Sequence, residues 1–71
     1  MKRTLVNSSA ISSVGYDPDR RILEIAFHHG GIYQYLKVPK RIYIALMQAD
    51  SKGAYYDVYV KKPGYDFKQI A

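Results

Sequence analysis

A glycine-containing turn between two strand-forming runs constrains the fold of this chain more than any other feature. Residues 21–28 alternate between polar and apolar side chains, and residues 32–37 form a second run rich in strand-preferring residues. The apolar face of the first run carries Leu23, Ile25 and Phe27. His28–Gly31 separates the runs with two adjacent glycines, as a tight connection requires. The pattern predicts an antiparallel β-hairpin.

The length of that turn decides which side chains of the hairpin face the core. Tyr33 and Tyr35 lie two residues apart on the second strand, so they share one face. A turn of two or four residues places them opposite the apolar face of the first strand, free to stack on a ligand. A three-residue turn with a left-handed glycine instead places them in the core, with their hydroxyls at its rim. We favour this core register, because the other one buries the Gln34 amide, which costs about 1 to 3 kcal/mol without a partner.

A helix is predicted after the hairpin, because Pro39 suits the first helical position and apolar residues follow at helical spacing. We expect it to span Pro39–Ala49 and to bury one stripe on the sheet. The stripe consists of Ile42, Ala45, Leu46 and Ala49.

Residues 54–60 leave two alternatives open. Their composition favours a strand. Ser51 is a good helix N-cap, however, and the spacing of Tyr56, Tyr59 and Val60 suits one face of a helix. A second short helix is the alternative that we prefer.

The remaining segments are short. Residues 12–16 resemble a strand that ends in an Asp17-Pro18-Asp19 turn, and Tyr65–Ile70 is at most a short terminal strand. We therefore expect a single α+β domain over residues 1–71. Its antiparallel three-stranded sheet packs against one helix, with a second short helix near the C-terminus.

Positive charge is concentrated in the second half of the chain. The whole chain has 11 Lys and Arg against six Asp and Glu. Residues 37–71 hold seven of the basic residues against three acids, whereas residues 1–36 hold four against three. A polyanion is the partner that would use such a field, although a net charge of this size also serves solubility alone.

The composition and motifs also favour a cytoplasmic location and argue against metal binding and catalysis. The chain has no cysteine, no signal-like apolar run and no stretch long enough to cross a membrane, so we expect a cytoplasmic protein without a membrane role. His28 and His29 are adjacent and lack further ligands at metal spacing, which favours a turn role for both. No nucleophile motif accompanies the serines at 8, 9, 12 and 13. We expect neither catalysis nor a cofactor.

Several short patterns occur together in an order that is typical of one known family. They are Ser8-Ser9, Ile11, Val14-Gly15-Tyr16-Asp17, Leu23-Glu24-Ile25, Phe27, Gly30, Tyr33-Gln34-Tyr35, Val38-Pro39, Leu46-Met47 and Ala49-Asp50-Ser51-Lys52-Gly53. Over nearly its whole length the chain resembles the KTSC domain, a small domain found at the C-terminus of some lysyl-tRNA synthetases and as a stand-alone bacterial or phage protein. The Tyr-x-Tyr motif of that family maps onto Tyr33 and Tyr35. Because the domain is attached to synthetases, the resemblance implies RNA binding. The family has no known catalytic activity.

The chain departs from the family pattern at two places. Tyr56-Asp57 stands where the family usually has Phe-Asn, and Val60-Lys61 stands where it usually has Ile-Arg. Because a lysine lacks the planar fork of arginine, Lys61 cannot make a bidentate phosphate contact.

The basic residues and tyrosines together suggest how the chain would bind a nucleic acid. Lys37, Lys40 and Arg41 crowd the positive end of the predicted helix, where an anion would meet free N–H groups as well as cations. Lys52, next to the N-cap Ser51, is more suited to capping than to a phosphate loop, since the Walker pattern is absent. The predicted binding residues are Tyr33, Tyr35, Lys37, Lys40, Arg41, Lys52, Lys61 and Lys62.

The sequence thus predicts a non-catalytic nucleic-acid-binding module with single-stranded or structured RNA as the favoured ligand. Phosphates would contact the basic residues and bases would stack on tyrosines. The alternative is a protein-interaction module, such as one encoded by a phage, because tyrosine and basic residues serve protein interfaces too.

Overall fold

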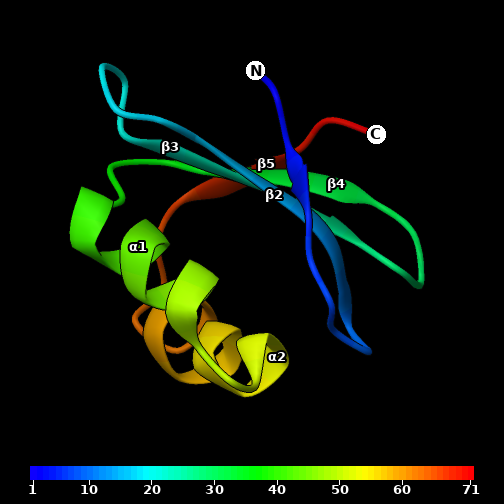
Figure 1. The fold of residues 1–71 in the computed structure, drawn as a ribbon. Coiled ribbons are helices and arrows are strands. Elements are labelled where there is room, and N and C mark those ends of the chain that lie inside the picture. Colours follow the sequence, from blue (N-terminus) through cyan, green and yellow to red (C-terminus); the bar gives the residue numbers. More distant parts are fainter.

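Five strands form one antiparallel sheet in sequential order in the computed structural model, which describes residues 1–71 (Figure 1). The strands are β1 (Thr4–Leu5), β2 (Ile11–Asp17), β3 (Ile22–Phe27), β4 (Ile32–Tyr35) and β5 (Phe67–Gln69). Between β4 and β5 the chain forms α1 (Lys40–Gln48), α2 (Lys52–Tyr56) and the π-helical turn η1 (Asp57–Lys61). This helical layer covers one face of the sheet (Figure 1). The α+β class is confirmed.

The predicted number of three strands is wrong, because short strands extend the sheet at both edges. β1 pairs with β2 through only two residues, and β5 pairs with β4 through three. Segments this short show no readable alternation, so their strand form depends on the neighbouring edge and not on local sequence.

The hairpin between β3 and β4 has the core register. Leu23 pairs with Tyr35 and Ile25 with Tyr33, and the Phe27 N–H donates to the Gly31 carbonyl at 3.1 Å. The connection therefore has three residues, as the core register predicts. The backbone φ of Gly31 is +90°, and a Cβ there would lie 2.9 Å from Cε1 of Tyr33, so both conformation and space require glycine.

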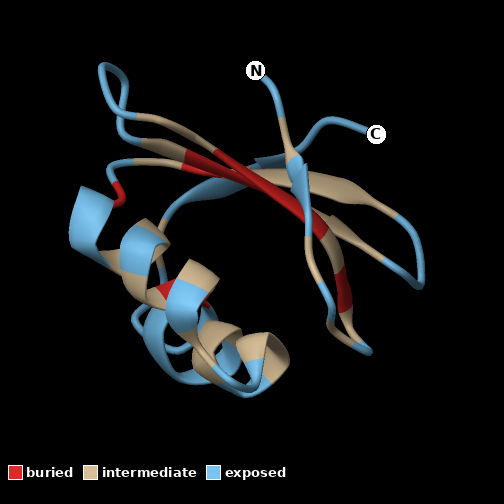
Figure 2. Ribbon diagram, in the orientation of Figure 1, coloured by how far each residue is buried: buried red, intermediate tan, exposed pale blue.

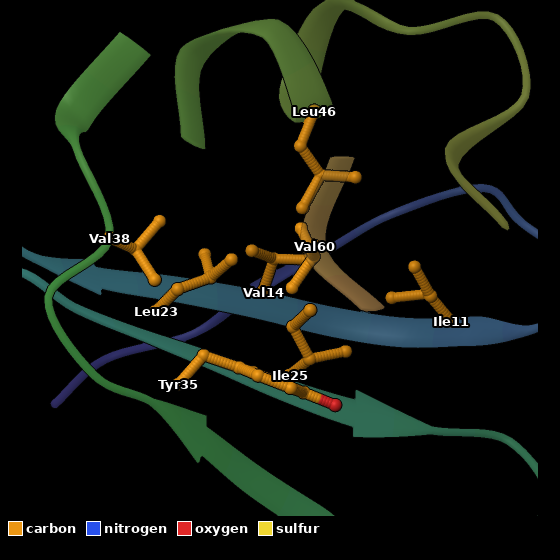
Figure 3. Packing of buried hydrophobic residues seen from close by; sticks show 8 residues of the cluster. All are labelled: Ile11, Val14, Leu23, Ile25, Tyr35, Val38, Leu46 and Val60. Carbon is orange, nitrogen blue, oxygen red and sulfur yellow. The ribbon is translucent and has the colours of Figure 1, made fainter. Parts of the chain in front are cut away.

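The core lies between the sheet and the helical layer. Figure 3 shows its eight buried hydrophobic residues, with Leu46 of α1 and Val60 of η1 directed toward side chains of β2 and β3. The eight are Ile11, Val14, Leu23, Ile25, Tyr35, Val38, Leu46 and Val60. The buried segments of β2 and β3 run through the middle of the sheet (Figure 2).

Helix α1 is slightly shorter than predicted. Pro39 occupies the N-cap with an extended ψ of 147°, so the helix begins at Lys40, and it ends at Gln48. Leu46 is the one fully buried member of the predicted stripe, while Ile42, Ala45 and Ala49 are half-buried. The Tyr16 hydroxyl donates to the Val38 carbonyl at 2.6 Å and thereby ties β2 to the chain that enters the helix.

The segment after Ser51 is helical, which confirms the second short helix. The Ser51 hydroxyl accepts a hydrogen bond from the Ala54 N–H at 3.3 Å, as an N-cap does. The chain then widens into η1, where the Lys62 N–H reaches the Asp57 carbonyl at 3.0 Å. Burial of Val60 against the sheet outweighs the strand propensity of its neighbours. None of the helices is both long and apolar enough to cross a membrane.

The other face of the sheet carries a buried polar network under the N-terminal segment. Glu24 is buried there and accepts hydrogen bonds from Arg3 and, at 2.8 Å, from the Gln34 amide. Arg3 also donates to the Ser13 hydroxyl at 2.9 Å. Burial opposes the ionised form of Glu24, but these hydrogen bonds and the Arg3 charge hold its pKa below the ordinary value.

Candidate nucleic-acid interface

A groove of about 880 Å³ separates part of the sheet from α2 and η1. Its walls come from both layers. Four of its aromatic residues come from strands β3, β4 and β5. Two more come from α2 and from the segment between η1 and β5. The six are Phe27, Tyr33, Tyr35, Tyr56, Tyr65 and Phe67. The groove is therefore an aromatic cavity at the boundary of the two layers.

The rings of the groove contact one another mainly by edges and tilted faces. The Tyr35 ring meets the Tyr56 ring edge-on at a centroid distance of 5.8 Å, and Phe27 meets Tyr56 in the same way at 5.2 Å. Phe67 lies tilted against both Tyr33 and Tyr35, at 5.9 and 5.6 Å. Such contacts are favourable between aromatic rings and do not use every ring face.

Tyr35 lies at the base of the groove and is only 4% exposed. Its hydroxyl lies 2.6 Å from the Tyr56 hydroxyl. Burial, followed by that hydrogen bond, raises the pKa of Tyr35 well above its ordinary value, so the phenol stays neutral. This burial matches the core register that the hairpin predicts, and it leaves little of the Tyr35 ring on which a base could stack. Tyr33 is half-buried on the groove wall, whereas Phe67 is 60% exposed.

Two predicted lysines line the groove and differ in what they contact. The Lys52 ammonium donates to the Ala49 carbonyl at 3.0 Å, at the C-terminal end of α1 where a cation is favourable. The predicted capping of the next helix belongs to the Ser51 hydroxyl instead. Lys61 is exposed on the groove, with Lys62 beside it, and neither has a carboxylate partner, because the only salt bridge joins Arg3 to Glu24. The carboxylates of Asp50 and Asp57 also line the groove.

The cations before and within α1 lie outside the groove. Lys37, Lys40 and Arg41 are all exposed, and the first turn of α1 has neither an acidic residue nor a side-chain cap. A hydrogen bond of 2.9 Å from the Val38 N–H to the Arg21 carbonyl brings the β2–β3 turn next to this end. Arg20 and Arg21 therefore join these cations, which the sequence did not indicate. The predicted basic residues thus form two groups instead of one surface.

Sequence reasoning also missed most of the groove. Tyr56 and Phe67 come from segments far from the hairpin, and only the fold brings them to Tyr33. His29 occupies the hairpin turn as predicted, and its ring stacks on Phe27 at 5.4 Å beside the groove. The helical spacing of Tyr56 with Tyr59 and Val60 was the one sequence signal that could have pointed to this side of the groove. No group of three His, Cys, Asp or Glu residues is arranged to hold a metal ion.

These features define a small α+β domain with an aromatic groove whose lining also includes two lysines and two aspartates. The KTSC domain model matches residues 7–65, and this chain belongs to the KTSC domain family. A KTSC domain protein from Yersinia pestis has the same fold, with a TM-score of 0.93, 46% identity, and coverage of 99% of this chain and 97% of that one. The resemblance seen in the sequence is confirmed.

The sequence relatives include stand-alone proteins and much longer ones. An uncharacterized protein from Stutzerimonas stutzeri is 40% identical over 70 residues, which cover 99% of both chains. A lysine–tRNA ligase from a Nostoc species is 38% identical over 53 residues, which cover 75% of this chain but 9% of the ligase. A lysine–tRNA ligase from Nostoc punctiforme is 32% identical over 63 residues, and the match covers 11% of it. The domain is thus similar to a small part of each ligase.

Proposed function

We propose that this domain binds single-stranded nucleic acid, with RNA favoured, and that it does so without catalysis. The observation that carries the proposal is the open aromatic groove, whose lining includes Lys61 without a carboxylate partner. Single-stranded ligands offer exposed base faces and a charged backbone together, and this pairing of rings with cations matches both.

The aromatic walls would supply the larger part of the binding energy. Stacking of a base on an aromatic side chain is worth about 1 to 3 kcal/mol and tolerates any base. Tyr33 and Phe67 offer partly or largely exposed rings at the groove, whereas the buried Tyr35 supports them from below. Little sequence preference is expected from such a surface.

The cations would supply the salt-dependent part. Lys61 lines the groove and Lys62 follows it in the chain, whereas Lys37, Lys40 and Arg41 form a separate group of cations at the start of α1. Two of the relatives are named lysine–tRNA ligases. Because that name includes an RNA, we favour RNA over DNA as the ligand.

A salt titration tests this function. Affinity for a fluorescent single-stranded RNA should fall with rising salt, with a log–log slope of about −0.7 for each contacted phosphate. Replacing the groove cation Lys61 and its neighbour, Lys61→Gln with Lys62→Gln, should flatten the slope, whereas Lys2→Gln at the exposed N-terminus should not. A complete lack of binding at low salt, or binding that ignores salt, would overturn the proposal.

A second candidate function is protein binding by the outer surface of the helical layer. Ile44, Val58 and Tyr59 are 43%, 50% and 50% exposed, respectively. Exposed apolar side chains of this kind are common at protein interfaces. Co-purification of one protein after nuclease treatment, lost on Val58→Ser and Tyr59→Ser substitution, would favour this function over the first.

A further inference from the structure

We propose that the groove is a pocket for one unpaired nucleobase, whose phosphate contacts Lys61 and whose edge meets the Tyr35–Tyr56 hydroxyl pair. This inference rests on the proposed function and specifies where a single nucleotide sits. The groove would recognise the base, and the cations around α1 would make only secondary contacts with the nucleic acid.

The size and walls of the groove suit a flat ring. Cavities that hold small ligands are typically about 300 to 1,000 Å³, and this one has about 880 Å³. Its walls are aromatic on both sides, with Tyr33 and Phe67 from the sheet and Tyr56 and Tyr65 from the helical side. A planar ligand would contact both layers at once. An aliphatic ligand would gain burial but no stacking.

The hydroxyl pair gives the pocket a polar contact among its aromatic side chains. Tyr35 and Tyr56 together carry two hydroxyl hydrogens, and the 2.6 Å bond between them uses one. When Tyr35 donates this bond, the hydrogen of the half-buried Tyr56 hydroxyl is left for a ligand acceptor. Burial of Tyr35 keeps its phenol protonated, which preserves this donor. Every nucleobase carries ring-edge acceptors, so the contact orients a base without selecting one.

The charged side chains of the groove determine where the phosphate of the bound nucleotide lies. Lys61 lines the groove without a carboxylate partner, whereas Lys52 is already bonded to the Ala49 carbonyl. Asp57 is the acidic side chain closest to Lys61 in the chain and also lines the groove. The phosphate of the inserted nucleotide would therefore contact Lys61, the groove lysine that has no hydrogen bond of its own, and Asp57 in the same helical turn would weaken that contact.

Filling the groove tests the inference without removing any of its rings. Ala54 is exposed on α2 and lines the groove, so Ala54→Leu adds volume there. Gln48→Leu is the matched control, because it adds the same side chain at an exposed position of α1 outside the groove. Circular dichroism and thermal unfolding check that both variants fold.

We expect Ala54→Leu to weaken single-stranded RNA binding about tenfold, and Gln48→Leu to leave it unchanged. If Ala54→Leu does not fold, Phe67→Ala removes an exposed ring and should give a similar loss. Uridine monophosphate alone should shift the NMR signals of Phe67 and Tyr56 in the wild type. RNA binding that is equal in the wild type and the folded groove variant would overturn the pocket and leave the function standing. Absence of RNA binding by the wild type would overturn both.

Discussion

The space between sheet and helical layer has a closed region and an open one, and their side chains differ. In the closed region beneath α1, the aliphatic residues Val14, Leu23, Val38 and Leu46 have no exposed surface (Figure 3). In the open region, next to α2 and η1, aromatic rings line the groove. Aliphatic packing excludes water and stabilises the fold, whereas rings in edge contact keep an open surface. The proposed binding function therefore uses a different part of the interface from the one that stabilises the fold.

Removing one side chain from each region gives the largest expected contrast. Leu46→Ala should reduce the free energy of unfolding by about 2 to 5 kcal/mol, because it leaves a cavity in a fully packed site. Phe67→Ala should reduce it by less than about 1 kcal/mol, because that ring is largely exposed. Urea unfolding of both variants measures the difference. Equal losses would mean that the open region also carries the fold.

The buried Glu24 on the opposite face should contribute the next largest effect. Glu24→Gln should destabilise the domain by about 1 to 3 kcal/mol at neutral pH, because Arg3 loses its charged partner. The folded pKa of Glu24 lies below the ordinary value of 4.5, so its stabilisation is complete above that pH and is lost as pH falls toward the folded pKa.

Unfolding curves at several pH values separate this contribution from the rest. Wild-type stability should fall on acidification more than that of Glu24→Gln. A variant with the same acid sensitivity as the wild type would assign the effect to other carboxylates.

The glycines of the hairpin turn connect the two regions, since they fix the register that puts Tyr33 on the groove. Gly31→Ala should cost about 1 to 2 kcal/mol from its positive φ alone. It should also displace the Tyr33 ring, which a new Cβ would approach to 2.9 Å. Gly30→Ala shares the positive φ, of 113°, and meets no atom within 4 Å. Thermal unfolding should rank Gly31→Ala as the more damaging, and the reverse order would argue against the steric role of Tyr33.

The hydroxyl pair at the base of the groove should have the smallest effect on stability. Tyr56→Phe removes the bond to Tyr35 at a cost of about 0.5 to 1.5 kcal/mol. Hydrogen exchange should quicken in α2 and η1 but not in α1, if the two regions are independent. Uniformly faster exchange would show that the open region is coupled to the closed one.

The hairpin and both helices could be predicted because their signals are local. Alternation fixed the strands, and the Ser51 cap with the Tyr56–Val60 spacing outweighed strand propensity. The core register was favoured because the other register would bury the Gln34 amide without a partner, and this argument was incomplete. The Gln34 amide is half-buried on the other face, where Glu24 satisfies it.

The rest of the site could not be predicted because it depends on contacts between distant segments. β1 and β5 are too short to show alternation, so neither the Arg3–Glu24 pair nor the position of Phe67 could be inferred. The tyrosine motif was recognised from its residues, but Tyr35 proved to be buried support for the groove. Proximity in sequence also suggested that Lys37, Lys40 and Arg41 act with the tyrosines, and the fold separates them from the groove.

Mapping of a bound single-stranded RNA by NMR tests the central claim most directly. Backbone and ring signals of the labelled domain would be followed during titration with a short RNA, and with a duplex of the same sequence as the control. We predict the largest shifts at Tyr33, Tyr56, Lys61 and Phe67, with weaker ones at Lys40 and Arg41, and little response to the duplex. Shifts confined to the α1 cations, or none at all, would contradict the assignment of binding to the open region.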